Sequence, residues 1–283
     1  DGVELNEVNI VTRKLGTMKL RSSVMNEDMI SSAELSRAAC CNLGESFVTN
    51  PSVDVSYSDA ATGAKQIKLL GLSGTYVQML TENIPNYRGA AAPYGLGYVP
   101  GPWMQSIQVS KGTSSVKNGY EAITGQINVE FKKPQLPEAD WVSANLFAST
   151  TNRYEANADA TLKLSKRWST SLLVHYENET KAHDGNDDGF VDIPQVEQYN
   201  VWNRWAYMGD HYVFQAGIKA LSETRTSGQV NHGGTMHSGD LYKVGIDTER
   251  YEFFTKNAYI FNKEKNTNLA LILSTTLHNQ DAT

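Results

Sequence analysis

The residues with the clearest chemical pattern lie in one short acidic segment with the sequence DGNDDGFVD. Asp184, Asn186 and Asp188 occupy the first, third and fifth positions of the calcium-loop pattern D-x-[DN]-x-[DN]-G. The carbonyl of Phe190 would be the ligand at position seven, and Asp192 the ligand at position nine. Carboxylates this close together repel one another unless a cation neutralises them. We therefore predict a structural Ca²⁺ ion here, although position twelve is glutamine instead of glutamate; the alternative is a solvated acidic turn.

A second group of side chains offers the sulfur and imidazole ligands that a soft metal such as copper prefers. Its members are Cys40, Cys41, His232, Met236 and His237. The two cysteines are adjacent in the sequence, and a disulfide between neighbours is strained. The alternative, which we favour, is that the cysteines pack as small apolar side chains and the other residues belong to a flexible glycine-rich loop.

A third candidate site is a glycine-rich stretch that carries four aromatic side chains and one arginine. These residues are Tyr87, Arg88, Tyr94, Tyr98 and Trp103. Aromatic rings on a glycine framework suit a large, partly apolar ligand, so we expect this loop to face outward and contact such a ligand. The alternative is that the loop packs against neighbouring strands. The sequence shows no catalytic triad, paired-carboxylate cleft, phosphate loop or zinc signature, so we predict no enzyme activity.

The acidic segment sits in a region that alternates apolar and polar residues, strand after strand. Residues 141–149, 156–164 and 168–176 each follow this period of two, which is typical of strands with one face in an apolar medium. The opposite face carries Asp, Lys, Arg and Glu, as the wet lumen of a transmembrane barrel does. The side chains expected to contact lipid are Val142, Leu146, Leu162, Leu172 and Val174.

The connections between these strands differ in length. Short turns at residues 165–167 and 209–210 alternate with long loops at residues 181–198 and 224–241. Outer-membrane barrels sort short turns to the periplasmic side and longer loops to the outside. Seven strands are expected, and an open sheet of seven would leave two unpaired edges in lipid, which is not tolerated. We therefore predict that residues 134–283 are seven antiparallel strands of a larger barrel.

Composition limits the possible functions. The 283-residue chain has a formal net charge of −6, so nucleic acid is not an expected partner. Its mean hydropathy is −0.43, and no stretch approaches the roughly 18 apolar residues of a membrane helix. This test does not detect the strands of a membrane barrel, because polar residues that face the lumen alternate with their apolar residues.

The first part of the chain has a different pattern and predicts a compact α+β domain over residues 1–133. The sequence Ser31-Ser32-Ala33-Glu34 fits a capping box that opens a short helix, and Asn42 looks like a second helix start. Pro134 and Pro137 mark the linker to the next domain. The predicted strands are residues 53–57, 66–70, 76–80, 107–110 and 126–131.

Four segments of this domain carry a resemblance to a known family. In order they are QIKLLGL, YVQMLTENIP, MQSIQVSKG and GYEAITGQINV, at residues 66–72, 76–85, 104–112 and 119–129. They resemble the I-x-I-R-G, L-I-D-G-V-P, I-E-x-I-E-V-x-R-G and Y-G-x-x-A-x-G-G-x-I-N-I motifs of the TonB-dependent outer-membrane receptors, especially receptors of the Bacteroidetes type. Leu70 replaces the usual arginine and Glu82-Asn83 replaces Asp-Gly. A salt bridge of the family is therefore expected to be absent or rebuilt.

The resemblance implies a plug domain that closes a barrel of about 22 strands, of which residues 134–283 would be the first seven. The barrel would lie in the bacterial outer membrane, where no ATP is available. A TonB-type inner-membrane energy complex would then pull on an extended segment near the N-terminus. The candidate for this segment, a TonB box able to add a strand to a partner sheet, is Glu7, Val8, Asn9, Ile10, Val11 and Thr12. The alternative is an ordinary first strand of the plug.

The same resemblance implies energised uptake of a scarce ligand: an iron–siderophore, a haem or a cobamide. The acidic calcium-like segment slightly favours a cobamide, by analogy. The other expected partners are outer-membrane lipid and a surface lipoprotein. Three other functions stay open: a copper or other metal-ion importer of the same architecture, a passive porin or adhesin, and a soluble all-β domain.

Overall fold

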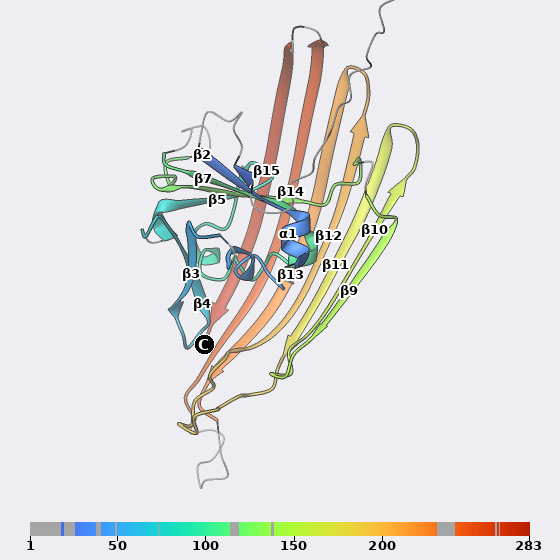
Figure 1. Cartoon of the computed structure of the whole chain (residues 1–283). Helices are drawn as coiled ribbons and strands as arrows, with labels where there is room; N and C mark the ends of the chain where they lie inside the picture. Colours follow the sequence, from blue (N-terminus) through green and yellow to red (C-terminus); the bar gives the residue numbers. More distant parts are fainter. Residues whose placement is uncertain are drawn as a thin grey trace, which may run out of the picture.

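The computed structural model describes residues 18–19, 26–37, 41–48, 50–72, 74–113, 119–136, 139–230, 241–263, 265 and 267–283. Its strands form a six-stranded sheet, a two-stranded hairpin and a seven-stranded sheet. Figure 1 shows the long strands of the seven-stranded sheet side by side, with the smaller elements packed against one of its faces. We call the seven-stranded sheet the wall and the described part of residues 18–136 the plug. Within the described residues, no helix combines the length and apolar character needed to cross a bilayer.

The six-stranded sheet of the plug is mixed, because β5 pairs parallel with β8 and the other pairs are antiparallel. A separate antiparallel hairpin, β3 and β4, lies beside it. In spatial order the sheet contains β1 (Met18–Lys19), β2 (Asn26–Ser31), β7 (Met104–Lys111), β8 (Gly125–Phe131), β5 (Val77–Thr81) and β6 (Ile84–Pro85), and the hairpin is β3 (Val53–Asp59) and β4 (Ala64–Leu69). The helical elements are α1 (Ser32–Arg37), η1 (Glu45–Phe47), η2 (Gly74–Tyr76), η3 (Gly89–Ala91) and η4 (Gly101–Trp103).

Most of the predicted plug elements are present. The helix begins at Ser32 as predicted, and the five predicted strands correspond to β3, β4, β5, β7 and β8 with ends that differ by a few residues. The second helix, predicted from Asn42, is only the 3₁₀ turn η1, because the chain reaches Asn50-Pro51 soon afterwards. Strands β2 and β6 were not predicted; β2 is too polar (NEDMIS) to show an apolar alternation.

The wall is a meander in which each strand pairs antiparallel with the next one in the sequence. Strand β12 already begins at Gln195 and β13 continues to Gly228, so the predicted long loops were drawn too long. The reason is that Gln195 still pairs in register with Thr226, beyond the point where the apolar alternation stops. The wall strands are β9 (Val142–Ala148), β10 (Tyr154–Lys163), β11 (Trp168–Glu179), β12 (Gln195–Met208), β13 (Tyr212–Gly228), β14 (Lys243–Asn262) and β15 (Thr267–Ala282).

The two faces of the wall are reversed relative to a soluble protein. The apolar side chains of Leu146 and Leu172 are 81% and 45% exposed, as expected for lipid contact, whereas Asp159 on the opposite face is only 9% exposed. The plug covers this polar face (Figure 1), in agreement with the expected plug inside a barrel. Asn200, Arg204 and other polar side chains there are almost completely buried.

An apolar cluster joins the plug to the wall. Trp202 of β12 is 5% exposed, and its ring centre lies 4.3 Å from that of Phe131 in an edge-on arrangement. Trp103 and Phe254 complete the aromatic contacts, each with a ring centre within 6.4 Å of Trp202. Gly217 on the neighbouring strand makes room, since a Cβ there would lie 2.7 Å from Trp202 Nε1.

We predict that Trp202→Ala lowers the free energy of unfolding by about 3–5 kcal/mol, because it leaves a cavity between plug and wall. Trp205→Ala is the matched control: Trp205 lies on the same strand but is 41% exposed on the outer face. Its loss is expected to be about 1 kcal/mol or less. Denaturant unfolding in detergent, followed by circular dichroism, measures both, and equal losses would contradict the packing described here.

Candidate functional site

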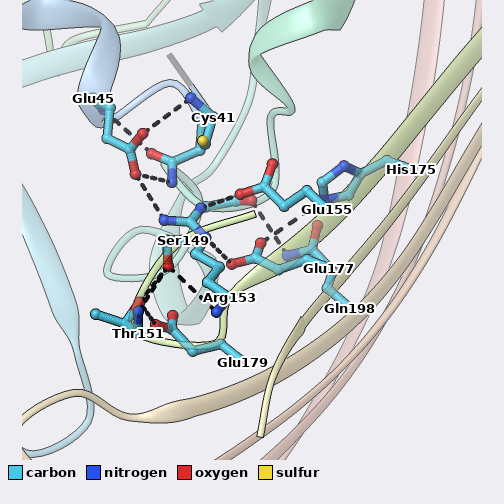
Figure 2. A network of polar contacts seen from close by, with 12 residues as sticks. Cys41, Glu45, Ser149, Thr151, Arg153, Glu155, His175, Glu177, Glu179 and Gln198 are labelled. Atoms are coloured by element: carbon cyan, nitrogen blue, oxygen red, sulfur yellow. Dashed lines mark hydrogen bonds and ion pairs between the residues drawn. The ribbon is translucent and has the colours of Figure 1, made fainter. Parts of the chain in front are cut away.

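Arg153, at the end of the β9–β10 turn, joins the plug to the wall through three carboxylates (Figure 2). Its Nη1 lies 3.0 Å from Glu45 of the plug, its Nη2 lies 2.6 Å from Glu155, and its Nε lies 3.0 Å from Glu177. The arginine side chain is 16% exposed. A planar guanidinium can serve several carboxylates at once, so one side chain fixes the position of η1 against β10 and β11.

Local hydrogen bonds hold Glu45 in place for this contact. The Cys41 N–H donates to Glu45 Oε2 at 3.0 Å, and Asn42 Nδ2 donates to Glu45 Oε1 at 3.0 Å. The Glu45 N–H donates in return to Asn42 Oδ1 at 3.3 Å. This reciprocal pair follows the N-x-x-E spacing of a capping box, which was the sequence signal for a helix start at Asn42.

A cavity of about 350 Å³ lies beside Arg153, between the plug hairpin and the wall. From the plug it is lined by Tyr57, Lys65 and Tyr94, and from the wall by Glu179 and Arg225, among others. It lies at the end of the wall that carries the longer loops, residues 180–194 and 229–242, which faces outward in outer-membrane barrels. Burial lowers the pKa of the Lys65 ammonium, against the opposing effect of Glu45.

A second buried ion pair joins the plug to strand β12 of the wall. Glu82 of the plug lies 2.6 Å from Arg204, and both side chains are 3% exposed. Lys256 Nζ donates to the Glu82 carbonyl at 2.6 Å, and Arg204 Nη1 donates to the Lys132 carbonyl at 2.7 Å. Glu82 and Asn83 both adopt positive φ, at 51° and 62°. The plug thus supplies the carboxylate of an ion pair whose arginine belongs to the wall. The expected loss or rebuilding of the family's own salt bridge stays a prediction.

A third polar cluster surrounds Tyr87. Lys219 Nζ donates to the Tyr98 carbonyl at 3.0 Å and to the Tyr87 hydroxyl at 3.3 Å. Asn86 Nδ2 donates to Glu252 at 2.9 Å, and Arg250 pairs with the same carboxylate at 2.7 Å. Burial raises the pKa of Tyr87 well above its usual value, so its hydroxyl stays protonated.

These contacts correct the prediction that the aromatic loop faces outward. Tyr87, Tyr98 and Trp103 are 4%, 0% and 0% exposed, because their rings pack between plug and wall. Tyr94 lines the cavity, and Arg88 is half-exposed and pairs with Glu121 at 2.5 Å. Ligand contact through this loop therefore stays a prediction for Tyr94 and Arg88, and the other three residues have a packing role in this structure.

The acidic segment forms a closed turn in the β11–β12 loop. Asp184 Oδ2 accepts from the Gly189 N–H at 2.8 Å, and Asp192 Oδ2 accepts from the Gly185 N–H at 2.7 Å. Gly189 has φ +84°, as the sharp turn requires. The oxygen donors suit Ca²⁺, but among the described residues no three His, Cys, Asp or Glu side chains converge to hold a metal. The calcium site predicted at Asp184, Asn186, Asp188, Phe190 and Asp192 stays a prediction.

The soft-metal candidates and the TonB box lie largely outside the described residues. Of the metal candidates only Cys41 is described; it is buried, and burial together with Glu155 and Glu45 raises the pKa of its thiol. A protonated thiol is a poor metal ligand, since metals bind the thiolate. The candidates outside the described residues are Cys40, His232, Met236 and His237, and for the TonB box Glu7, Val8, Asn9, Ile10, Val11 and Thr12.

Comparisons with known proteins agree with this architecture. The family described as the TonB-dependent receptor plug domain matches residues 19–126. The chain is similar to the vitamin B12 transporter BtuB of Vibrio vulnificus (strain CMCP6), with 24% identity over 185 residues, covering 65% of this chain and 30% of that protein. Two solved structures share its fold at a TM-score of 0.70. One is the alcaligin outer-membrane receptor FauA from Bordetella pertussis, which is 12% identical; the match covers 93% of this chain and 40% of FauA. The other is the closed form of the ferric-catecholate import receptor Fiu from E. coli K12, which is 16% identical; the match covers 96% of this chain and 40% of Fiu.

We predict that Arg204→Met destabilises the protein by about 3–5 kcal/mol, because it leaves the buried Glu82 without its closest cation. The double variant Arg204→Met/Glu82→Gln should recover most of this loss, since no buried charge then lacks a partner. Denaturant unfolding of the two variants and of Glu82→Gln completes the cycle. Additive losses in the double variant would show that the pair does not connect the plug to the wall.

Proposed function

Because this chain belongs to the TonB-dependent outer-membrane receptors, we propose that it imports a scarce ligand across the outer membrane with energy from the inner membrane. The observation that carries the proposal is the filled interface between plug and wall. An apolar cluster around Trp202 and two buried charge clusters, around Glu82 and Tyr87, occupy the inner face of the described strands. The chain spans 30% of the curated relative and 40% of each of the two solved chains, so the function of the whole protein is inferred.

A plug held in this way argues against a passive porin or an adhesin. Moving it requires breaking buried ion pairs such as Glu82–Arg204, and the outer membrane has no ATP to supply the work. A TonB-type inner-membrane complex that pulls on residues 7–12 would supply it instead. A strand-forming handle suits such a partner, since backbone pairing with a sheet edge transmits force without needing a deep pocket.

The names of the relatives support a proposal for the ligand class. One is named as a vitamin B12 transporter, and the solved structures include receptors for alcaligin and ferric catecholates. We place the ligand of this chain among the cobamides and iron–siderophores, with haem as a further member of the class. Copper import has less support, because Cys41 is buried and the other soft-metal candidates lie outside the described residues. A surface lipoprotein as an additional partner stays a prediction.

Deleting the gene and measuring uptake of labelled cobalamin, ferric siderophores and haem tests the function directly. Uptake of one of these is expected to fall to background and to return on complementation. Normal uptake of all of them, together with an open-pore conductance when the purified protein is inserted in liposomes, would favour the passive porin.

We predict that Val8→Pro abolishes uptake while leaving ligand binding to whole cells unchanged, because proline removes a backbone donor from the strand that the energy complex would pair with. Val8→Ala is the matched control, since it keeps the backbone N–H, and should retain most of the uptake. If the proline variant transports normally, residues 7–12 are not the handle.

We also propose that residues 184–192 bind Ca²⁺, which would order the β11–β12 loop. Isothermal titration of Ca²⁺ into chelator-treated protein is expected to show one site, lost in Asp184→Asn/Asp188→Asn. Asp210→Asn is the control, because Asp210 is an exposed acidic residue in the β12–β13 turn at the opposite end of the wall. Equal heats from the parent protein and the double variant would assign this segment to a solvated turn.

A further inference from the structure

We propose that the cavity beside Arg153 receives a hydrogen-bond-donating, positively charged group of the ligand, such as an ammonium or guanidinium, in preference to an anionic group. This inference rests on the proposed function, because it names the chemistry of the imported ligand at this site. It comes from the balance of charges and open hydrogen-bonding atoms in the cavity.

Two of the three cations in the cavity, Arg153 and Arg225, already have carboxylate partners. Arg153 contacts Glu45, Glu155 and Glu177 at 2.6–3.0 Å. Arg225 lies 3.0 Å from Glu223, and its guanidinium stacks 5.2 Å from the ring centre of Tyr94. Lys65 lies over the Tyr57 ring at 5.5 Å. The lining contains these three cations and four carboxylates, so an anionic ligand group would have to compete with carboxylates that are already in place.

Two hydrogen-bond acceptors in the cavity are open. Glu179 is 7% exposed and accepts one hydrogen bond, from the Thr151 hydroxyl at 3.3 Å; no Lys, Arg or His nitrogen of the described residues lies within 4.0 Å of its carboxylate. Gln198 is 1% exposed and lines the same cavity. Its Nε2 donates to Glu223 at 2.8 Å and to the Gly97 carbonyl at 3.3 Å, whereas its buried Oε1 has no partner (Figure 2).

A buried acceptor without a donor is costly, and a buried carboxylate without a cation more so. A ligand that brings an N–H donor to Gln198 and a positive charge to Glu179 removes both costs on binding. An anion offers neither interaction and adds repulsion from Glu177, Glu179 and Glu223. The cavity volume of about 350 Å³ is enough for an amine-bearing arm of a larger ligand, with the rest of the ligand outside.

The test uses three small probes of equal chain length and different charge: 1,5-diaminopentane, 1,5-pentanediol and glutarate. Each is titrated calorimetrically into the purified full-length receptor. The diamine is expected to bind at one site, the diol at least tenfold more weakly, and glutarate without measurable heat. Glu179→Gln should weaken diamine binding roughly tenfold, the usual worth of a charged hydrogen bond.

Glu197→Gln is the matched control. Glu197 lies near the start of β12, next to Gln198, but its side chain is on the outer face, where it accepts hydrogen bonds from the Tyr176 and Tyr199 hydroxyls. It should leave diamine affinity within twofold of the parent. Glutarate binding more tightly than the diamine, no diamine binding, or equal diamine affinity in the parent and Glu179→Gln would each overturn the inference. Uptake is measured separately: failure of import with diamine binding intact would contradict the proposed function and leave the cavity chemistry standing.

Discussion

The structure depends on a single constraint: the polar face of the wall is buried, so each charge on it needs a partner that the plug or a neighbouring strand supplies. Arg153 meets Glu45 of the plug, and Arg204 meets Glu82. A buried ion pair is costly to break but contributes little net stability when intact. Such contacts therefore specify where the plug sits, while the aromatic cluster around Trp202 supplies the apolar burial.

This division determines what separating the plug from the wall would cost. Separation would expose the apolar cluster to water and would leave buried charges such as Glu82 without their closest partners. The charge clusters are spread over the inner face of the wall, from Arg153 with its partners on β10 and β11 to the Glu82–Arg204 pair on β12.

The alternation of side chains was enough to predict the wall strands and which face is apolar, because a period of two is a local property. The plug motifs were also local. The sequence could not predict which side chains of the polar face the plug would contact. Leu173, for example, lies on that face among polar neighbours and is buried because the plug covers it. Arg153 was not singled out from the sequence, since its partner Glu45 is more than a hundred residues away along the chain. Tyr98 was expected on the outside because the wall residues that contact it, such as Lys219, are also more than a hundred residues away in the sequence.

The central claim is that lipid contacts the apolar face of the wall while the plug covers the other face. Nitroxide labels on single cysteines at Leu172, Ile218 and Ser171, read by power-saturation electron paramagnetic resonance in liposomes, test it most directly. The account predicts that Leu172 and Ile218 labels collide with oxygen and not with a water-soluble nickel chelate, and that the Ser171 label is shielded from both. A nickel-accessible label at Leu172 or Ile218 would contradict it.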